Sequence, residues 1–274
     1  MLVSAYVRAD LFEGRTVFVT GGGSGINLGI AKSFAAVGAD VAICGRTAER
    51  LEAAAREVAA LGARVSTSVA DVRDYAALEA ALAKSRAELG PASVLVCGAA
   101  GNFVARAEAL TPNGFKAVVD IDLLGSFHAA RAGFAQLKET RGSLIFISAG
   151  QSYLPHAFQA HVGAAKAGVD NLMRNLALEW GPLGIRSNSI VPGPIEGTEG
   201  MRRLAGTANA ELWKRRVPLG RTGTVDEIGA MAVVLASPLA SYVTGAQVVV
   251  DGGTGLAGSG LFNQMVEGAL GAER

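Results

Sequence analysis

The sequence predicts an α/β fold: a doubly wound parallel sheet of about seven strands, with helices on both faces. Short β-rich runs alternate about six times with longer stretches rich in Ala, Leu, Glu and Arg. Several short runs, such as Leu144–Ile147, are continuously apolar, which is typical of strands covered on both faces. A glycine-rich turn joins the first run to the first helical stretch. These features indicate a Rossmann-like sheet, and we expect residues 1–274 to form a single domain because no composition shift divides them.

The elements follow one another in a regular order. The expected strands are Thr16–Thr20, Asp40–Gly45, Arg64–Ala70, Ser93–Gly98, Gly142–Ser148, Ile185–Val191 and Ala246–Val250. The expected helices are Ile26–Val37, Ala48–Leu61, Tyr75–Leu89, Asn113–Glu139, His161–Trp180 and Val225–Ala236. Thr47 and Thr224 suit helix N-caps, because each is followed by an acidic residue in the first turn.

Residues 192–223 interrupt the alternation. They contain Pro192, Pro194 and the basic stretches Met201-Arg202-Arg203 and Trp213-Lys214-Arg215-Arg216. A long excursion late in a doubly wound fold often covers a ligand, so we expect about residues 193–223 to form a substrate-covering insertion. A pair of surface helices with solvated arginines explains the same residues equally well.

Composition excludes several classes of protein. The formal net charge of +1 gives no footprint for nucleic acid or an anionic membrane. The three histidines lack metal-ligand spacing, so we expect no metal site. Cys44 and Cys97 lie in apolar runs and are expected to be buried free thiols. With no signal peptide and no apolar run of membrane-spanning length, we expect a cytoplasmic protein.

The glycine-rich turn predicts a dinucleotide site. It reads Thr20-Gly21-Gly22-Gly23-Ser24-Gly25-Ile26-Asn27-Leu28-Gly29 and lies between a strand and a helix. Glycine allows the backbone to turn sharply and its N–H groups to approach a pyrophosphate, while the helix N-terminus favours the negative charge. The residues expected to contact the cofactor here are Gly21, Gly23, Ser24, Gly25 and Ile26.

The residue after the second strand favours one of the two nicotinamide cofactors. The second strand ends Cys44-Gly45-Arg46, without the acidic residue that would bond the ribose 2′-hydroxyl of NAD. Arg46 can pair with the 2′-phosphate of NADP, so we expect NADP(H).

The pattern Thr-Gly-x-x-x-Gly-x-x resembles that of the short-chain dehydrogenases/reductases, and the resemblance extends over nearly the whole chain. It departs at Asn27, where the family usually has a third glycine. Cys97–Gly101 stands where the family has its Asn-Asn-Ala-Gly turn. The resemblance implies further cofactor contacts at Asp71, Val72, Ala99, Ala100, Gly101, Lys166, Pro192, Gly193 and Ile195.

The catalytic set of that family is mostly missing. Counting back from Lys166 places Val162 in the family's Tyr position and Ala149 in its Ser position, while Asp122 fills the Asn position. Valine cannot transfer a proton and alanine cannot polarise a carbonyl. Ordinary carbonyl and alcohol chemistry by the usual route is therefore not expected.

The chain is most similar to one branch of the family, the peroxisomal-type 2,4-dienoyl-CoA reductases, over about residues 10–255. The matching segments are Gly98–Phe103, Val119–Asp122, Gly163–Asp170 and Pro192–Met201. The resemblance implies that NADPH reduces the far end of a conjugated dienoyl thioester in unsaturated fatty-acid oxidation, and that a proton is added back on carbon.

The resemblance implies that a water is held between two carboxylates, here Asp122 and Asp251, and two close carboxylates can share a proton. Lys166 holds the nicotinamide ribose and supplies positive charge to the dienolate. Two alternatives stay open: Asp122 bonds the backbone in a kinked helix, or Asp251 caps the turn before Gly252-Gly253.

An acyl-CoA is the expected substrate. Asn102, Phe103 and Phe115 are candidates for the acyl pocket, and Arg202 for the CoA phosphates. The resemblance also implies a homodimer or homotetramer, paired through the helices Asn113–Glu139 and His161–Trp180. Two other functions remain open: a different enoyl-thioester reductase, or a catalytically inactive NADP-binding regulator.

Overall fold

In the computed structural model, which describes residues 3–5, 7–199, 201 and 216–259, one parallel sheet organises the chain. Its strand order is β3-β2-β1-β4-β5-β6-β7, and every neighbouring pair is parallel. The bounds are β1 Thr16–Thr20, β2 Asp40–Gly45, β3 Val65–Val69, β4 Ala92–Cys97, β5 Ser143–Ile147, β6 Arg186–Pro192 and β7 Gln247–Val250. The Rossmann-like doubly wound fold expected from the sequence is confirmed.

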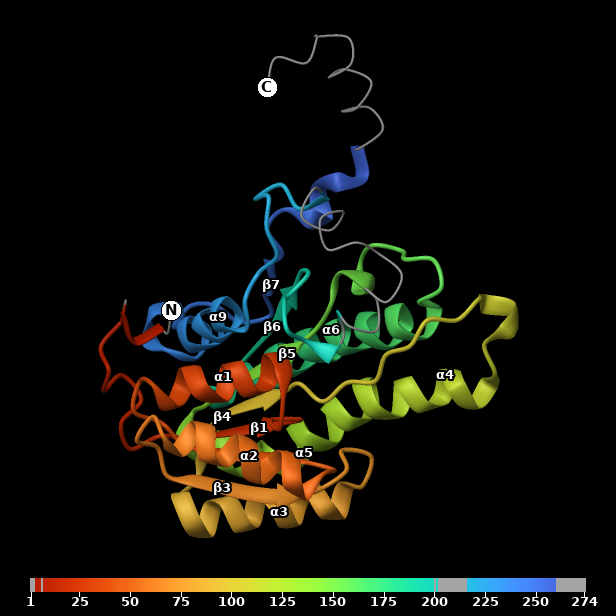
Figure 1. Cartoon of the computed structure of the whole chain (residues 1–274). Coiled ribbons are helices and arrows are strands. Elements are labelled where there is room, and N and C mark those ends of the chain that lie inside the picture. Colours follow the sequence, from red (N-terminus) through yellow and green to blue (C-terminus); the bar gives the residue numbers. More distant parts are fainter. Residues whose placement is uncertain (1–2, 6, 200, 202–215, 260–274) are drawn as a thin grey trace, which may run out of the picture.

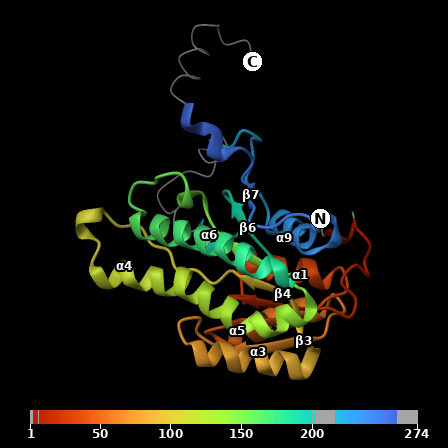
Figure 2. The same ribbon diagram turned by 180° about the vertical axis from the view of Figure 1, so that it is seen from behind.

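Helices cover both faces of the sheet (Figures 1 and 2). One face packs against α1 (Gly25–Ala35), α2 (Ala48–Ala59) and α9 (Val225–Ala236). The other packs against α3 (Tyr75–Leu89), α5 (Gly125–Thr140) and α6 (Ala160–Trp180). Strand residues alternate between the two cores: Val17 and Val19 face the first, and Phe18 faces the second. The continuously apolar strands are thus explained, because neither face of the sheet meets water.

The expected helix Asn113–Glu139 is interrupted. The structure divides it into α4 (Pro112–Val119), a π-helical turn (Asp120–Leu124) and α5. Ser126, in the first turn of α5, donates its hydroxyl back to the Asp122 carbonyl in the π turn at 2.5 Å. A π turn inserts a residue into the helical ladder and is common at functional sites. Here it contains Asp122, whose side chain is completely buried.

The two expected N-caps differ. Thr224 forms a full capping box at the start of α9: its hydroxyl accepts from the Glu227 N–H at 3.3 Å, and the Glu227 carboxylate accepts from the Thr224 N–H at 2.8 Å. Thr47 takes the N-cap position of α2, but its side chain forms no capping hydrogen bond. The residue type therefore predicted where both helices begin, but only Thr224 forms the expected capping hydrogen bond.

Much of the expected insertion lies outside the described residues, which include 192–199, 201 and 216–223 of that region. Its role as a substrate cover stays a prediction. In the described part of the chain, no helix combines the length and the apolar character needed to cross a bilayer.

Candidate active site

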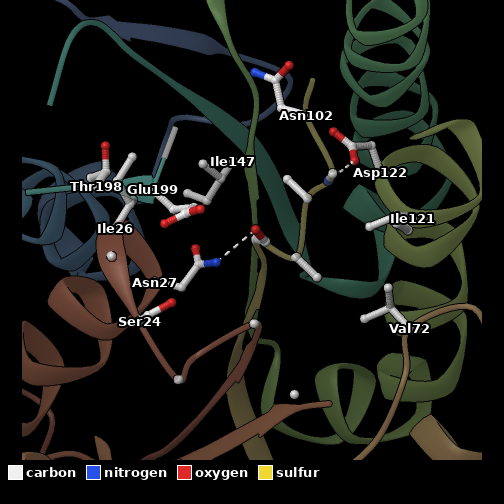
Figure 3. A pocket seen from close by; sticks show the side chains of 18 of the residues that line it. Ser24, Ile26, Asn27, Val72, Asn102, Ile121, Asp122, Ile147, Thr198 and Glu199 are labelled. Atoms are coloured by element: carbon white, nitrogen blue, oxygen red, sulfur yellow. Dashed lines mark hydrogen bonds between the residues drawn. The ribbon is translucent and has the colours of Figure 1, made fainter. Parts of the chain in front are cut away.

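A cavity of about 730 Å³ opens at the carboxyl ends of the strands. Its wall includes all the residues that the sequence proposed for the cofactor: Gly21, Gly23, Ser24, Gly25, Ile26, Arg46, Asp71, Val72, Ala99, Ala100, Gly101, Lys166, Pro192, Gly193 and Ile195. In Figure 3, Ser24, Ile26 and Asn27 stand on one side of the cavity, and Val72, Ile121 and Asp122 on the other. Crevices at this edge of a doubly wound sheet are where such folds bind ligands. Direct contacts of these residues with a dinucleotide stay a prediction.

The glycine-rich turn has the geometry that a dinucleotide needs. Gly21 has a φ of +68°, which favours glycine, and a Cβ on Gly22 would lie 2.6 Å from the Ile43 side chain. The turn therefore packs closely on β2 and leads into the N-terminus of α1, where Gly25 and Ile26 line the cavity. The partial positive charge of that helix end favours a pyrophosphate. This cradle fits a dinucleotide.

Two arginines line the cavity beyond β2. Arg46 was expected, and Arg50, one helical turn later on α2, was missed. Neither forms an ion pair with a carboxylate among the described residues. The nearby Asp71 is engaged by Arg73, whose side chain donates to it at 3.0 Å and holds the pKa of that carboxyl below its usual value. The two guanidinium groups are thus available to a phosphate.

Asp122 and Lys166 form a buried pair on the cavity wall. Asp122 Oδ1 accepts from the Gly101 N–H at 2.7 Å (Figure 3), and Oδ2 lies 3.1 Å from Lys166 Nζ. Lys166 also donates to the Ile147 carbonyl at 2.9 Å. The aspartate does bond backbone, as one alternative held, and it also faces a lysine that lines the cavity. A carboxylate and an ammonium group therefore meet at one point of the site.

The wall beside this pair is apolar. Val162 and Ala149 both line the cavity. The neighbouring Ser148 hydroxyl donates to the buried Asp170 at 2.8 Å, on α6. The Ser and Tyr positions of the family's catalytic set thus supply no hydroxyl here.

Asp251 lies behind the wall. Its carboxylate accepts from the N–H groups of Gly253 at 2.8 Å and Gly255 at 2.7 Å, which are the contacts of a turn cap. The residue packs against Gly193, where an added Cβ would lie 2.6 Å from the Asp251 Cα. Burial raises the pKa of the nearby Tyr153 hydroxyl, and Asp251 adds to that effect. A water shared by Asp251 and Asp122 stays a prediction.

The residues expected to bind the substrate differ in their position relative to the cavity. Asn102 lines the cavity. Phe103 and Phe115 are each 38% exposed, and neither is among the described lining residues. The Phe103 ring packs on the buried imidazole of His161, with centroids 4.2 Å apart, and burial lowers the pKa of that imidazole. Arg202 lies outside the described residues.

Residues from the late excursion also line the cavity and were not singled out from the sequence. They are Gly197, Thr198, Glu199 and Met201. The Thr198 hydroxyl donates to the Ile195 carbonyl at 2.8 Å, which closes a local turn in this part of the wall. The segment Pro192–Met201 was matched as a whole, so no separate role was assigned to its Thr198 or Glu199 side chain.

The sequence is similar to those of known reductases over most of its length. Residues 21–255 match the family model described as enoyl-(acyl carrier protein) reductase. The chain is 45% identical over 250 residues to the peroxisomal, (3E)-enoyl-CoA-producing 2,4-dienoyl-CoA reductase of Saccharomyces cerevisiae, a match that covers 90% of this chain and 86% of the relative. It is 39% identical over 245 residues to a Bacillus subtilis protein named "Probable 2,4-dienoyl-CoA reductase", (2E)-enoyl-CoA-producing, with 88% and 96% covered.

Solved structures are similar over the same range. An NADPH-bound short-chain oxidoreductase from Pseudomonas aeruginosa PAO1, described as containing an atypical catalytic center, is 33% identical with a TM-score of 0.82, and 88% of this chain and 97% of that chain are covered. A gluconate 5-dehydrogenase from Burkholderia cenocepacia J2315, in complex with NADP and tartrate, is 32% identical with a TM-score of 0.84, and 90% and 98% are covered. The chain therefore belongs to the short-chain dehydrogenase/reductase family of oxidoreductases, which bind NAD(P)(H).

Proposed function

We propose that this protein reduces 2,4-dienoyl-CoA thioesters with NADPH. The observation that carries the proposal is the buried Asp122–Lys166 pair on the cavity wall, beside Val162 and Ala149 where hydroxyl groups would serve ketone chemistry. The names of the relatives from Saccharomyces cerevisiae and Bacillus subtilis support a dienoyl thioester as the substrate.

NADP(H) is the proposed cofactor. Arg46 and Arg50 lie where the second strand meets the cavity and would pair with a 2′-phosphate. The glycine-rich turn would hold the pyrophosphate, and Lys166 the nicotinamide ribose. A bound NADPH supplies the hydride.

The protein's own residues serve the rest of the reaction. Addition of hydride to the far end of the diene moves an electron pair toward the thioester oxygen and yields a dienolate. The Lys166 ammonium would stabilise that negative charge, because charges interact more strongly in a site shielded from water. A proton then adds to carbon, so that two conjugated double bonds become one.

We infer that Asp122 directs this proton. Its Oδ1 is fixed by the Gly101 N–H, and its Oδ2 faces Lys166 on the cavity wall. A water bonded to this carboxylate would hand its proton to carbon and be reprotonated from solvent. A role for Asp251 as the second holder of the water stays a prediction, because its carboxylate accepts from the Gly253 and Gly255 N–H groups behind Gly193.

A panel of substrates at fixed NADPH tests the proposal. Purified protein should oxidise NADPH with a 2,4-dienoyl-CoA, and much more slowly with a 2-enoyl-CoA or a ketone of similar length. The product's double-bond position, read by NMR, then decides between the two regiochemistries named for the relatives. No turnover above the blank with any dienoyl-CoA would overturn the proposal.

A second candidate is the reduction of simple enoyl thioesters on CoA or acyl carrier protein. The description of the matching family model favours it. In the same panel, this function predicts that kcat/KM for the 2-enoyl thioester equals or exceeds that for the dienoyl thioester.

A homodimer or homotetramer belongs to the proposal. Apolar side chains remain exposed on the helical face of the π turn and α5, among them Leu124 and Phe127, at 43% and 44% exposure. Such residues suit a helix interface. Light scattering after size-exclusion chromatography measures the state directly, and a monomer at micromolar concentration would contradict it. The cytoplasmic location stays a prediction.

A further inference from the structure

Asn27, in the first turn of α1, reaches across to the end of β4. Its Nδ2 donates to the Gly98 carbonyl at 2.8 Å, a bond between residues far apart in the chain (Figure 3). A Cβ built on Gly98 would lie 2.0 Å from Asn27 Oδ1 and 2.6 Å from Asn27 Cγ. The amide of Asn27 therefore fills the space that a side chain at position 98 would need. The absence of a side chain at Gly98 leaves room for the Asn27 amide, and the Asn27 amide in turn leaves no room for a side chain at position 98.

The segment that Asn27 holds is the wall of the cavity next to Asp122. Gly98 N–H donates to the Thr20 hydroxyl at 3.0 Å, and Gly101 N–H donates to Asp122 Oδ1 at 2.7 Å. With the Asn27 bond, residues 98–101 are anchored to β1, to α1 and to the π turn. A continuous series of contacts thus joins the glycine-rich turn to the Asp122–Lys166 pair.

The other atom of the amide points to a ligand. Asn27 lines the cavity, and its buried Oδ1 has no hydrogen-bond partner among the described residues. A buried acceptor without a partner lowers stability, and a donor that arrives with a ligand removes that cost. A dinucleotide in this cavity carries hydroxyl and amide donors.

We propose that Asn27 is a positioning residue for the cofactor. Its Nδ2 fixes the gap between the glycine-rich turn and residues 98–101, and its Oδ1 accepts a hydrogen bond from the bound dinucleotide. Gly98 is its obligate partner. The proposal rests on dinucleotide binding in this cavity and not on the identity of the thioester.

Exchanging the residues at positions 27 and 98, so that the side-chain amide comes from the end of β4 and not from α1, tests whether the two positions are coupled. The variants are Asn27→Gly, Gly98→Asn and the double variant N27G/G98N, and Asn27→Ala controls for the cost of glycine in a helix. Each is measured by thermal unfolding without ligand and by the Kd for NADP⁺ in calorimetry. A KM-against-kcat comparison with NADPH follows for the folded variants.

Asn27→Ala should weaken NADP⁺ binding about fivefold, the equivalent of one ordinary hydrogen bond. Gly98→Asn alone should unfold at a much lower temperature, because its side chain has no space. The double variant should regain most of that loss and bind NADP⁺ better than Asn27→Ala. If Gly98→Asn does not fold at all, the recovery of folded protein in the double variant would equally show that the two positions compensate for each other.

Two outcomes would overturn the proposal. The melting-temperature changes of the two single variants could add in the double variant, which would show that the positions are independent. Alternatively, Asn27→Ala could bind NADP⁺ as wild type does, which would leave the amide without a role toward the cofactor. Neither measurement uses a thioester, so failure here is distinct from failure of the proposed reaction.

Discussion

Replacement of Asp122 by Asn separates charge from shape at the centre of the site. An asparagine keeps an oxygen for the Gly101 N–H, which Asp122 Oδ1 accepts at 2.7 Å. It removes the negative charge that lies 3.1 Å from Lys166 Nζ. Both side chains are buried, with 0% of Asp122 and 7% of Lys166 exposed, so the pair is poorly screened by water.

The magnitude follows from this burial. Removing one partner of a buried ion pair costs about 3–5 kcal/mol. Lys166 keeps the Ile147 carbonyl at 2.9 Å, so we take the lower end of that range. For a chain of this size, about 3 kcal/mol corresponds to a melting temperature lowered by about 6–12 °C. Loss of the group that directs a proton should lower kcat by about 100-fold or more.

The assay compares two neighbouring aspartates. Asp120→Asn is the matched control, since Asp120 lies in the same π turn but pairs with Lys116 at the surface. We expect the control to keep kcat within about threefold and the melting temperature within about 2 °C, as for a surface pair. If Asp122→Asn retained kcat while its stability fell, Asp122 would be structural, and the proposed proton path would be refuted.

Three further predictions concern other parts of the molecule. Arg46→Ala should raise KM for NADPH about 10-fold or more and leave KM for NADH nearly unchanged, because a charged hydrogen bond to the 2′-phosphate contributes about 1.5–3 kcal/mol. Arg221, which donates to Glu227 at 2.6 Å, lowers the pKa of Glu227 from 4.5 to about 2, so this carboxylate stabilises the fold above pH 4.5 and loses that contribution as the pH falls toward 2. Thermal unfolding of wild type and Glu227→Gln across that window should show a smaller acid loss in the variant. Burial raises the pKa of Cys44 to about 12 and also raises that of Cys97, so neither thiol should react with an aromatic disulfide reagent at pH 8 until denaturant is added.

Each of these has a contrary result. Equal rises of KM for NADPH and NADH in Arg46→Ala would mean that the arginine does not read the 2′-phosphate. Parallel acid profiles for wild type and Glu227→Gln would remove the role of that carboxylate. Rapid labelling of either cysteine in the native state would show that the strands open far more often than their burial indicates.

The sheet was predictable because its signals are local. Short β-rich runs, several of them continuously apolar, gave every strand to within one residue at each end, and β1 and β2 have the expected bounds. The cofactor wall was predictable for a related reason: in a parallel sheet the carboxyl ends of strands meet at one edge, so residues that follow the strands converge.

What was missed depends on contacts across the chain. The π turn at Asp120–Leu124 adds a single residue to the helical ladder, which apolar periodicity does not reveal. The Asn27–Gly98 contact joins two elements, so the sequence showed Asn27 only as an irregularity. The place of Asp251 behind Gly193 depends on how β6 and β7 pack, and the adjacent glycines could indicate only a turn.

The most direct test of the central claim is the stoichiometry of one reaction. Purified protein is given excess NADPH and limiting 2,4-hexadienoyl-CoA, and the NADPH consumed is compared with the enoyl-CoA formed by mass spectrometry. The account predicts one NADPH consumed for each dienoyl thioester, with an enoyl-CoA as the sole product. NADPH that is bound but not consumed, with the dienoyl-CoA recovered intact, would contradict it.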